Sequence, residues 1–301
     1  MSDVRIGIAL GSGGARGWAH IGVLRALESH GIKPGIVCGT SIGALIGGVY
    51  LGGRLVELED WARRLNKRRL SRLFDVQLGY GGIIAGRRIM HLFDAEFRNR
   101  RIEDLPARFA CIATEYDTGH EVWLQKGNLL EAIRASYALP GLLPPVQING
   151  HWLLDGALVN PVPASVCRAL GARLVIAVNL NTEFGENATG VNGDAGLAAE
   201  AILESVNGSS GVPLVRQLFA RRNCAPSMLS VVASSINIVQ DRLTRSRLAG
   251  EPPDVTIAPK IGGIGIMQFD RAKEGIAAGE HAVEDAAPAL DHALRRVNGR
   301  R

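Results

Sequence analysis

Several features that would place this sequence of 301 residues outside the cytoplasm or in a membrane are scarce or missing. Its four cysteines, Cys38, Cys111, Cys167 and Cys224, follow neither the spacing of a disulfide framework nor that of a metal site. No apolar run is long enough to span a bilayer, and the first residues enter a strand without the layout of a signal peptide. We therefore expect a cytoplasmic protein with buried free thiols and no bound metal.

Aromatic residues and excess charge are also scarce. Phe, Trp and Tyr make up 5% of the residues, and the formal net charge is +5. So modest a charge gives little reason to expect nucleic acid as a partner. The apolar fraction of 47% is enough for a sizeable core, and no internal repeat or domain boundary is evident. We therefore expect residues 1–301 to form a single domain.

Glycine, in contrast, is abundant, and many of the 37 glycines stand beside apolar runs, as in tight turns between strands and helices. The opening pattern predicts a strand at 4–10, a helix at 18–30, a strand at 35–38 and a buried helix at 44–51. This alternation is typical of parallel βαβ units. Further strands are predicted at 109–115, 121–124, 173–179 and 254–259, together with a hairpin at 147–154 that turns at Asn149-Gly150. Helices are predicted at 55–74, 87–97, 129–137, 163–170, 214–222, 227–248 and 269–296.

The stretch Gly-Thr-Ser-Ile-Gly at residues 39–43 connects the second strand to the buried helix. A serine between small residues on such a turn is the pattern of a nucleophile elbow, with Ser41 as the nucleophile. Glycine at both ends allows backbone segments to approach closely. A glycine-rich turn with a capping serine fits these five residues equally well.

A second glycine-rich turn, Gly-Ser-Gly-Gly-Ala-Arg-Gly at residues 11–17, follows the first strand. A dinucleotide-binding turn would need glycine where Arg16 stands, and a phosphate-binding P-loop would need a Gly-Lys-Ser/Thr sequence. The N–H groups of Gly13 and Gly14 would suit an oxyanion hole beside Ser41. A tight turn that needs glycine only for steric reasons remains an equal interpretation.

No histidine is placed to complete a Ser-His-Asp triad. The chain contains seven histidines, which we expect to be ordinary surface or capping residues: His20, His30, His91, His120, His151, His281 and His292. The alternative base is Asp155, which ends an apolar strand and precedes Gly156 and Ala157. A turn-forming Asp-Gly pair is the competing interpretation.

Together, the segments 13–17, 39–43 and 155–157 resemble the patatin-like phospholipases, and most closely the bacterial members of the neuropathy target esterase type. The resemblance extends from residue 4 to about residue 180 and returns in part at 246–259. Ser12 departs from the pattern, because many relatives carry glycine there.

This resemblance implies a patatin-like three-layer α/β/α sandwich with a central, mostly parallel sheet. It also implies a Ser-Asp dyad without a cofactor, in which Ser41 is the nucleophile and Asp155 the general base. Gly13 and Gly14 would donate to the oxyanion, and Arg16 would brace that loop or contact a lipid phosphate. The remaining motif positions are Gly39, Gly43, Gly156 and Ala157.

The expected function is hydrolysis of phospholipids, lysophospholipids or related lipid esters through an acyl-enzyme. A non-catalytic anion- or acyl-binding protein, and a thioesterase or protein deacylase, remain alternatives. The basic helix predicted at 55–74 fits a solvated surface better than a contact with an anionic inner membrane face, which stays open. Residues 182–210 are a candidate lid or mobile loop, and the oligomeric state is left open.

Overall fold

A computed structural model describes residues 5–66, 69–70, 76–79, 82–84, 95–181 and 228–299. The candidate lid at 182–210 and the predicted helix at 214–222 lie outside these ranges, as do His91 and Cys224. No helix in the described ranges is long and apolar enough to cross a membrane.

The centre of the fold is a sheet of eight strands in the order β10-β9-β1-β2-β5-β8-β7, with β6 also paired to β5. Pairing from β10 to β5 is parallel, whereas β6 and β8 run antiparallel to β5, and β7 runs antiparallel to β8. The strands are β1 (Ile6–Leu10), β2 (Ile36–Thr40), β5 (Arg108–Glu115), β6 (Glu121–Leu124), β7 (Val146–Ile148), β8 (His151–Asp155), β9 (Leu174–Val178) and β10 (Val255–Ile257). A separate hairpin pairs β3 (Val76–Gly79) with β4 (Gly82–Ile84).

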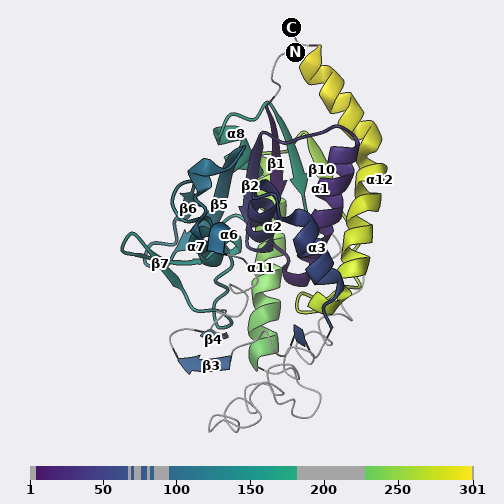
Figure 1. Ribbon diagram of the computed structural model, residues 1–301. Coiled ribbons are helices and arrows are strands. Elements are labelled where there is room, and N and C mark those ends of the chain that lie inside the picture. Colours follow the sequence, from purple (N-terminus) through teal and green to yellow (C-terminus); the bar gives the residue numbers. More distant parts are fainter. Residues whose placement is uncertain are drawn as a thin grey trace.

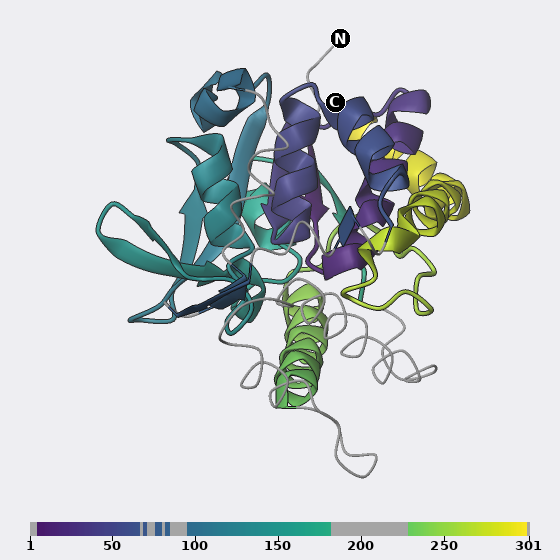
Figure 2. The ribbon, with the colours of Figure 1, turned by 60° about the horizontal axis from the view of Figure 1, so that its bottom comes forward.

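Helices cover both faces of this sheet (Figures 1 and 2). They are α1 (Ala19–Ser29), α2 (Ile42–Leu51), α3 (Leu55–Arg63), α6 (Ala95–Asn99), α7 (Leu129–Ser136), α8 (Ala164–Ala169), α11 (Met228–Gly250) and α12 (Ala272–Asn298). Short 3-10 helices are η1 (Gly14–Trp18), η2 (Ile102–Asp104), η3 (Gly156–Leu158) and η5 (Phe269–Arg271).

The two faces of the sheet carry different side chains. Large residues such as Ile8 and Leu10 pack against α1, α2, α3, α7 and α12. Their smaller neighbours, such as Ala9 and Cys38, pack against α8. Because both faces are covered, β2 and β9 are buried along their whole length. The structure thus confirms the expected α/β/α sandwich with a mostly parallel sheet, and Cys38, Cys111 and Cys167 are buried free thiols.

The terminal helix α12 contributes to the core of the fold. α12 packs along α1 (Figure 1), and glycines allow the two backbones to touch. A Cβ added to Gly22 would lie 2.0 Å from the Ile276 carbonyl oxygen, and one added to Gly279 would lie 2.0 Å from that of Ala19. Any larger residue at either glycine would push the helices apart.

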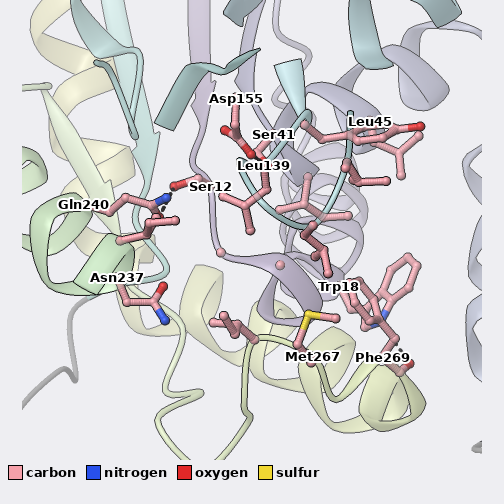
Figure 3. Close-up of a pocket in the computed structure, with 18 of the residues that line it drawn as sticks. Ser12, Trp18, Ser41, Leu45, Leu139, Asp155, Asn237, Gln240, Met267 and Phe269 are labelled. Carbon is pink, nitrogen blue, oxygen red and sulfur yellow. Dashed lines mark hydrogen bonds between the residues drawn. The ribbon is translucent and has the colours of Figure 1, made fainter. Parts of the chain in front are cut away.

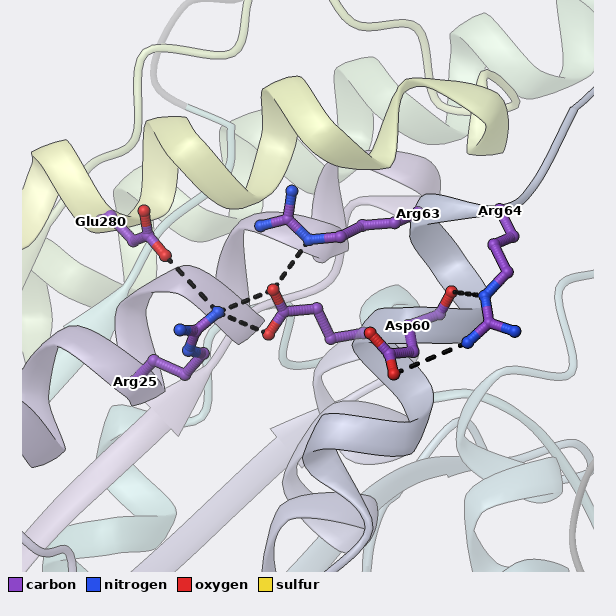
Figure 4. Close-up of polar contacts among 6 residues, drawn as sticks. Arg25, Asp60, Arg63, Arg64 and Glu280 are labelled. Atoms are coloured by element: carbon purple, nitrogen blue, oxygen red, sulfur yellow. Dashed lines mark hydrogen bonds and ion pairs between the residues drawn. The ribbon is translucent and has the colours of Figure 1, made fainter.

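The predicted basic helix at 55–74 is wrong in its length, because α3 ends at Arg63. The Asn66 side chain accepts a hydrogen bond from the Arg69 N–H at 2.9 Å, as an N-cap residue does where a new turn begins. The arginines of α3 are also engaged in ion pairs. Arg63 contacts Glu59 at 2.8 Å, and Arg64 contacts Asp60 at 3.6 Å (Figure 4).

The Glu59 carboxylate also joins α3 to the neighbouring helices. It accepts two hydrogen bonds of 2.7 Å from Arg25 on α1, and Arg25 in turn lies 3.9 Å from Glu280 on α12 (Figure 4). Glu59 itself is buried, so these partners compensate a charge that is largely removed from water.

Candidate active site

Ser41 stands on a sharp turn between β2 and α2. Its backbone has φ 57° and ψ −121°, a strained combination for a residue with a side chain. Glycine surrounds it for steric reasons: a Cβ on Gly39 would lie 2.5 Å from the Ala44 nitrogen, and one on Gly43 would lie 2.1 Å from the Leu10 carbonyl oxygen. The predicted elbow geometry is therefore present in the backbone.

Ser136, at the end of α7, anchors this turn through two hydrogen bonds. The Ser41 N–H donates to Ser136 Oγ at 2.9 Å, and the Ser136 hydroxyl donates to the Ile112 carbonyl at 2.6 Å. Ser136 has no exposed surface. The sequence alone does not reveal this role of Ser136, because its partner Ser41 is distant in the chain.

Asp155 ends β8 and faces Ser41. The Ser41 hydroxyl donates to Asp155 Oδ2 at 2.7 Å, and Asp155 Oδ1 accepts the Ala157 N–H at 2.8 Å. Between Asp155 and Ala157, position 156 requires glycine, because a Cβ there would lie 2.2 Å from the Ile112 carbonyl oxygen.

The environment of Asp155 favours its protonated form. The side chain is buried, and this desolvation raises its pKa from 3.8 to about 6, although the hydrogen bonds from Ala157 and Ser41 act in the opposite direction. An aspartate with this pKa is ionised at neutral pH and still basic enough to accept a proton.

The glycine-rich loop leaves two amides available near this pair. The Ser12 N–H donates to the Pro161 carbonyl, and the Ala15 N–H donates to the Ile266 carbonyl. Between them, the N–H groups of Gly13 and Gly14 have no hydrogen-bond partner among the described residues. Both glycines line the same pocket as Ser41 and Asp155.

Arg16 contacts the chain that follows β10. Its Nε donates to the Ile264 carbonyl at 2.7 Å. This hydrogen bond fixes η1 against residues 261–266, so the geometry matches a brace for the loop.

His20 differs from its prediction as a surface or capping residue. It is fully buried on α1, and its Nε2 lies 2.7 Å from the Gly11 carbonyl oxygen. Burial lowers the pKa of His20 to about 4, so the ring is neutral at pH 7 and Nε2 carries the proton that it donates. Among the described residues, no histidine lines the pocket that contains Ser41.

That pocket is apolar, with a volume of about 180 Å³. Figure 3 shows Ser41 and Asp155 at one side, with Trp18, Met267 and Phe269 farther along. Its walls come from η1, α2, α3, residues 139–143, residues 266–269 and α11. No local pattern in the sequence indicated that these segments meet. Within the described ranges, no cluster of His, Cys, Asp and Glu is suited to a metal ion.

Ser12 makes a side-chain contact that glycine could not make. Its hydroxyl lies 3.4 Å from Gln240 Oε1 on α11 (Figure 3), and both side chains are buried. The position that departs from the motif thus joins the glycine-rich loop to α11.

Known proteins match both the motifs and the fold. A family model described as "Patatin-like phospholipase" matches residues 8–168, which contain all three motifs. An "Uncharacterized NTE family protein" of Mycobacterium tuberculosis is 32% identical over 96% of this chain and 93% of its own length. "Patatin-like phospholipase domain-containing protein 6" of Homo sapiens is 34% identical over 59% of this chain and 13% of its own length.

Among solved structures, VipD from Legionella pneumophila aligns with a TM-score of 0.50 and 13% identity, over 97% of this chain and 68% of that chain. This likeness concerns the fold alone. The sequence matches, in contrast, confirm the resemblance that the three motifs indicated.

Proposed function

The chain belongs to the patatin-like phospholipase family, and we propose that it hydrolyses phospholipids, lysophospholipids or related lipid esters with Ser41 and Asp155 as a catalytic dyad. Family membership supports lipid-ester hydrolysis in general. The observation that carries the proposal of a dyad is the 2.7 Å hydrogen bond from Ser41 Oγ to Asp155 Oδ2. It places a base against a hydroxyl at the side of an apolar pocket.

In the first half of the reaction, Ser41 Oγ attacks the ester carbonyl while Asp155 accepts the hydroxyl proton. The carbonyl oxygen becomes an oxyanion, for which the N–H groups of Gly13 and Gly14 are the proposed donors. One such donor typically contributes about 3–4 kcal/mol to transition-state stabilisation. Collapse of the intermediate breaks the ester bond, and Asp155 returns the proton to the departing alcohol.

The second half releases the acyl group. Asp155 removes a proton from a water molecule, which attacks the acyl-enzyme carbonyl, and the same two amides stabilise the second oxyanion. When this intermediate collapses, the proton returns to Ser41 Oγ and the carboxylic acid leaves. Each step uses only groups of the chain, water and the ester.

The rest of the pocket suits an acyl chain. Apolar side chains such as Leu45, Leu58 and Trp61 line it, and the few polar residues lie near Ser41 or on α11. We assign Arg16 a supporting role, because its bond to Ile264 fixes the loop that carries Gly13 and Gly14.

The test combines labelling with turnover. A fluorophosphonate should label the native chain, and Ser41→Ala should abolish both the label and the hydrolysis of p-nitrophenyl butyrate and phosphatidylcholine. Asp155→Ala should reduce turnover of both esters, because Ser41 loses its proton acceptor. Turnover that survives both substitutions would contradict the dyad.

Other outcomes would identify the alternatives. If the native chain showed neither label nor turnover while a fatty acid raised its melting temperature, it would be a binding protein. Acyl thioesters or acylated peptides that react much faster than oxygen esters of lipids would indicate a thioesterase or protein deacylase.

A further inference from the structure

The helix α11 presents an apolar surface to solvent beside the pocket. Figures 1 and 2 show that it projects from the edge at which the parallel strands end. Residues 228–240 carry no charged side chain. Val231, Ile238 and Val239 are 48%, 50% and 54% exposed.

The exposed side of α11 changes character along the helix. Residues spaced three or four apart share one face, and exposed residues at this spacing are Val231, Ser235, Ile238, Arg242, Arg245 and Ala249. The stripe is apolar or small over its first two turns and cationic over the next. The Arg245 side chain is 63% exposed beside its ion pair with Asp241, and Arg242 has no ion pair among the described residues.

The opposite side of the same helix belongs to the pocket. Ile236, Asn237 and Gln240 line it together with Ser41 (Figure 3). Gln240, Asp241 and Thr244 are buried, which fixes the rotation of the helix against the body of the fold. The exposed apolar face is therefore one helix diameter from the proposed acyl site.

We propose that this face of α11, formed by Val231, Ile238 and Val239 and called the docking face below, inserts into the surface of a lipid bilayer, with Arg242 and Arg245 at the level of the headgroups. At a rise of about 1.5 Å per residue, Val231 and Ile238 are separated by about 10 Å along the helix. Interfacial helices lie in the membrane plane and bury their apolar side to a depth of about 5–10 Å, and this span gives α11 about two turns of apolar side chains along that plane. Arg242 follows about one turn later, where anionic headgroups lie.

A bilayer fits this face better than a second copy of the chain does. A symmetric pair would apply the same face twice, and the arginines of both copies would crowd one interface. Anionic headgroups would instead neutralise them. The basic helix predicted from the sequence is a weaker candidate, because α3 is short and its arginines have acidic partners.

The inference rests on the proposed function only for its biological meaning, which is that lipid reaches Ser41 from the membrane beside α11. Binding itself requires no turnover. It is therefore measured in the Ser41→Ala background, so that vesicles stay intact and a failure of the dyad leaves the result interpretable.

The test variant is Ile238→Glu/Val239→Glu, and the matched control is Val56→Glu, since Val56 on α3 is 69% exposed. Glutamate is a better helix former than valine or isoleucine, so each helix should persist. Binding is measured by flotation with vesicles of phosphatidylcholine, with and without phosphatidylglycerol. The double variant should bind both at least about tenfold more weakly, and the control should bind as the parent does.

Arg242→Gln supplies a separate measurement. It should weaken binding about fivefold for vesicles with phosphatidylglycerol and leave binding to pure phosphatidylcholine unchanged. In the active background, the double variant should lose hydrolysis of vesicle phosphatidylcholine in proportion to binding, while turnover of soluble p-nitrophenyl butyrate stays at the parental rate.

Three results would overturn the inference. They are unchanged vesicle binding in the double variant, an equal loss of binding in Val56→Glu, and conversion of a dimer to a monomer on light scattering with vesicle binding intact. The last would assign the docking face to a second copy. Vesicle binding through α11 without any ester hydrolysis would refute the proposed function and retain the docking face.

Discussion

Ser41 follows β2 and Asp155 ends β8, and these two strands lie on either side of β5 in one sheet. The apolar residues around them come from helices and loops far apart in the chain. The first group is held by hydrogen bonds of 2.6–2.9 Å and by glycines that allow no larger residue. The second group includes half-buried apolar side chains, such as those of Leu142, Ile266 and Met267. For the proposed reaction, we infer from this contrast that the group around Ser41 and Asp155, called the reaction centre below, would set the chemistry, and that the pocket wall would set the acyl chain that fits.

The division between reaction centre and pocket wall can be tested with esters of different chain length. A change in the reaction centre should affect every ester to the same degree, whatever its chain length. A change in the wall should affect long acyl chains and leave short ones alone.

Asp155→Asn should give the largest effect, a loss of about 10³–10⁴-fold in kcat on short and long esters alike. Asparagine can still accept the Ala157 N–H, but it cannot take the proton of Ser41. Steady-state kinetics with p-nitrophenyl acetate and a long-chain ester would measure the loss. A loss confined to the long ester would contradict the division.

The same variant should be more stable than the parent at neutral pH. Burial raises the pKa of Asp155 from 3.8 to about 6, so between these values the folded protein holds a proton that the unfolded chain has released. Stability therefore falls as pH rises through this window, by about 3 kcal/mol in total. In urea unfolding, Asp155→Asn should gain up to this amount at pH 7 and match the parent below about pH 4. Equal stability at both pH values would contradict the effect of burial on the carboxyl group.

Ser136→Ala should give the second largest effect, although Ser136 contacts no substrate. The Ser41 N–H loses its acceptor and the elbow can shift, so kcat should fall about 10–100-fold with KM unchanged. The buried amide left unpaired should cost about 1–3 kcal/mol of stability. Because a purely structural role would alter stability alone, the rate of fluorophosphonate labelling at Ser41 is the deciding measurement. Ser29→Ala, at an exposed end of α1, is the control that should change neither quantity.

The sequence predicted the reaction centre because its signals are local. Gly39, Gly43 and Gly156 are needed by turns that are a few residues long, and Ser41 and Asp155 stand within those turns. These turn signals made the residues candidates, and the family resemblance favoured them over the competing interpretations as simple turns. That Ser41 and Asp155 meet at 2.7 Å depends on the pairing of β5 with both β2 and β8, which brings them together across the sheet.

Contacts between distant segments could not be predicted in the same way. In the sequence, nothing distinguishes His20 from other polar residues of an amphipathic helix. Only the fold brings its ring within hydrogen-bond distance of the Gly11 carbonyl oxygen. The apolar side chains of residues 139–143 and 266–269 carry no mark that distinguishes a pocket wall from a core. The predicted helix at 55–74 is too long, because α3 ends at Arg63 and Asn66 caps a new turn, which the pattern of residues does not reveal.

The pH dependence of turnover also concerns the reaction centre. Asp155 must be ionised to accept the proton, so kcat/KM should fall about fivefold between pH 6 and pH 5. The inflection should be the same for p-nitrophenyl acetate and for long-chain esters. Activity that stays constant down to about pH 4 would mean an aspartate with an ordinary pKa and would contradict the effect of burial.

Met267→Ala should give the smallest effect and the most selective one. Met267 lines the pocket on the side away from Ser41 and Asp155 (Figure 3), so it can contact only the far part of an acyl chain. Its removal should lower kcat/KM for long-chain esters about five- to tenfold and leave p-nitrophenyl acetate unchanged. Leu294→Ala is the matched control, because Leu294 is a half-buried apolar residue of α12 outside the pocket. Equal losses on both esters in Met267→Ala would mean that the wall also positions Ser41, and the division between chemistry and chain selection would fail.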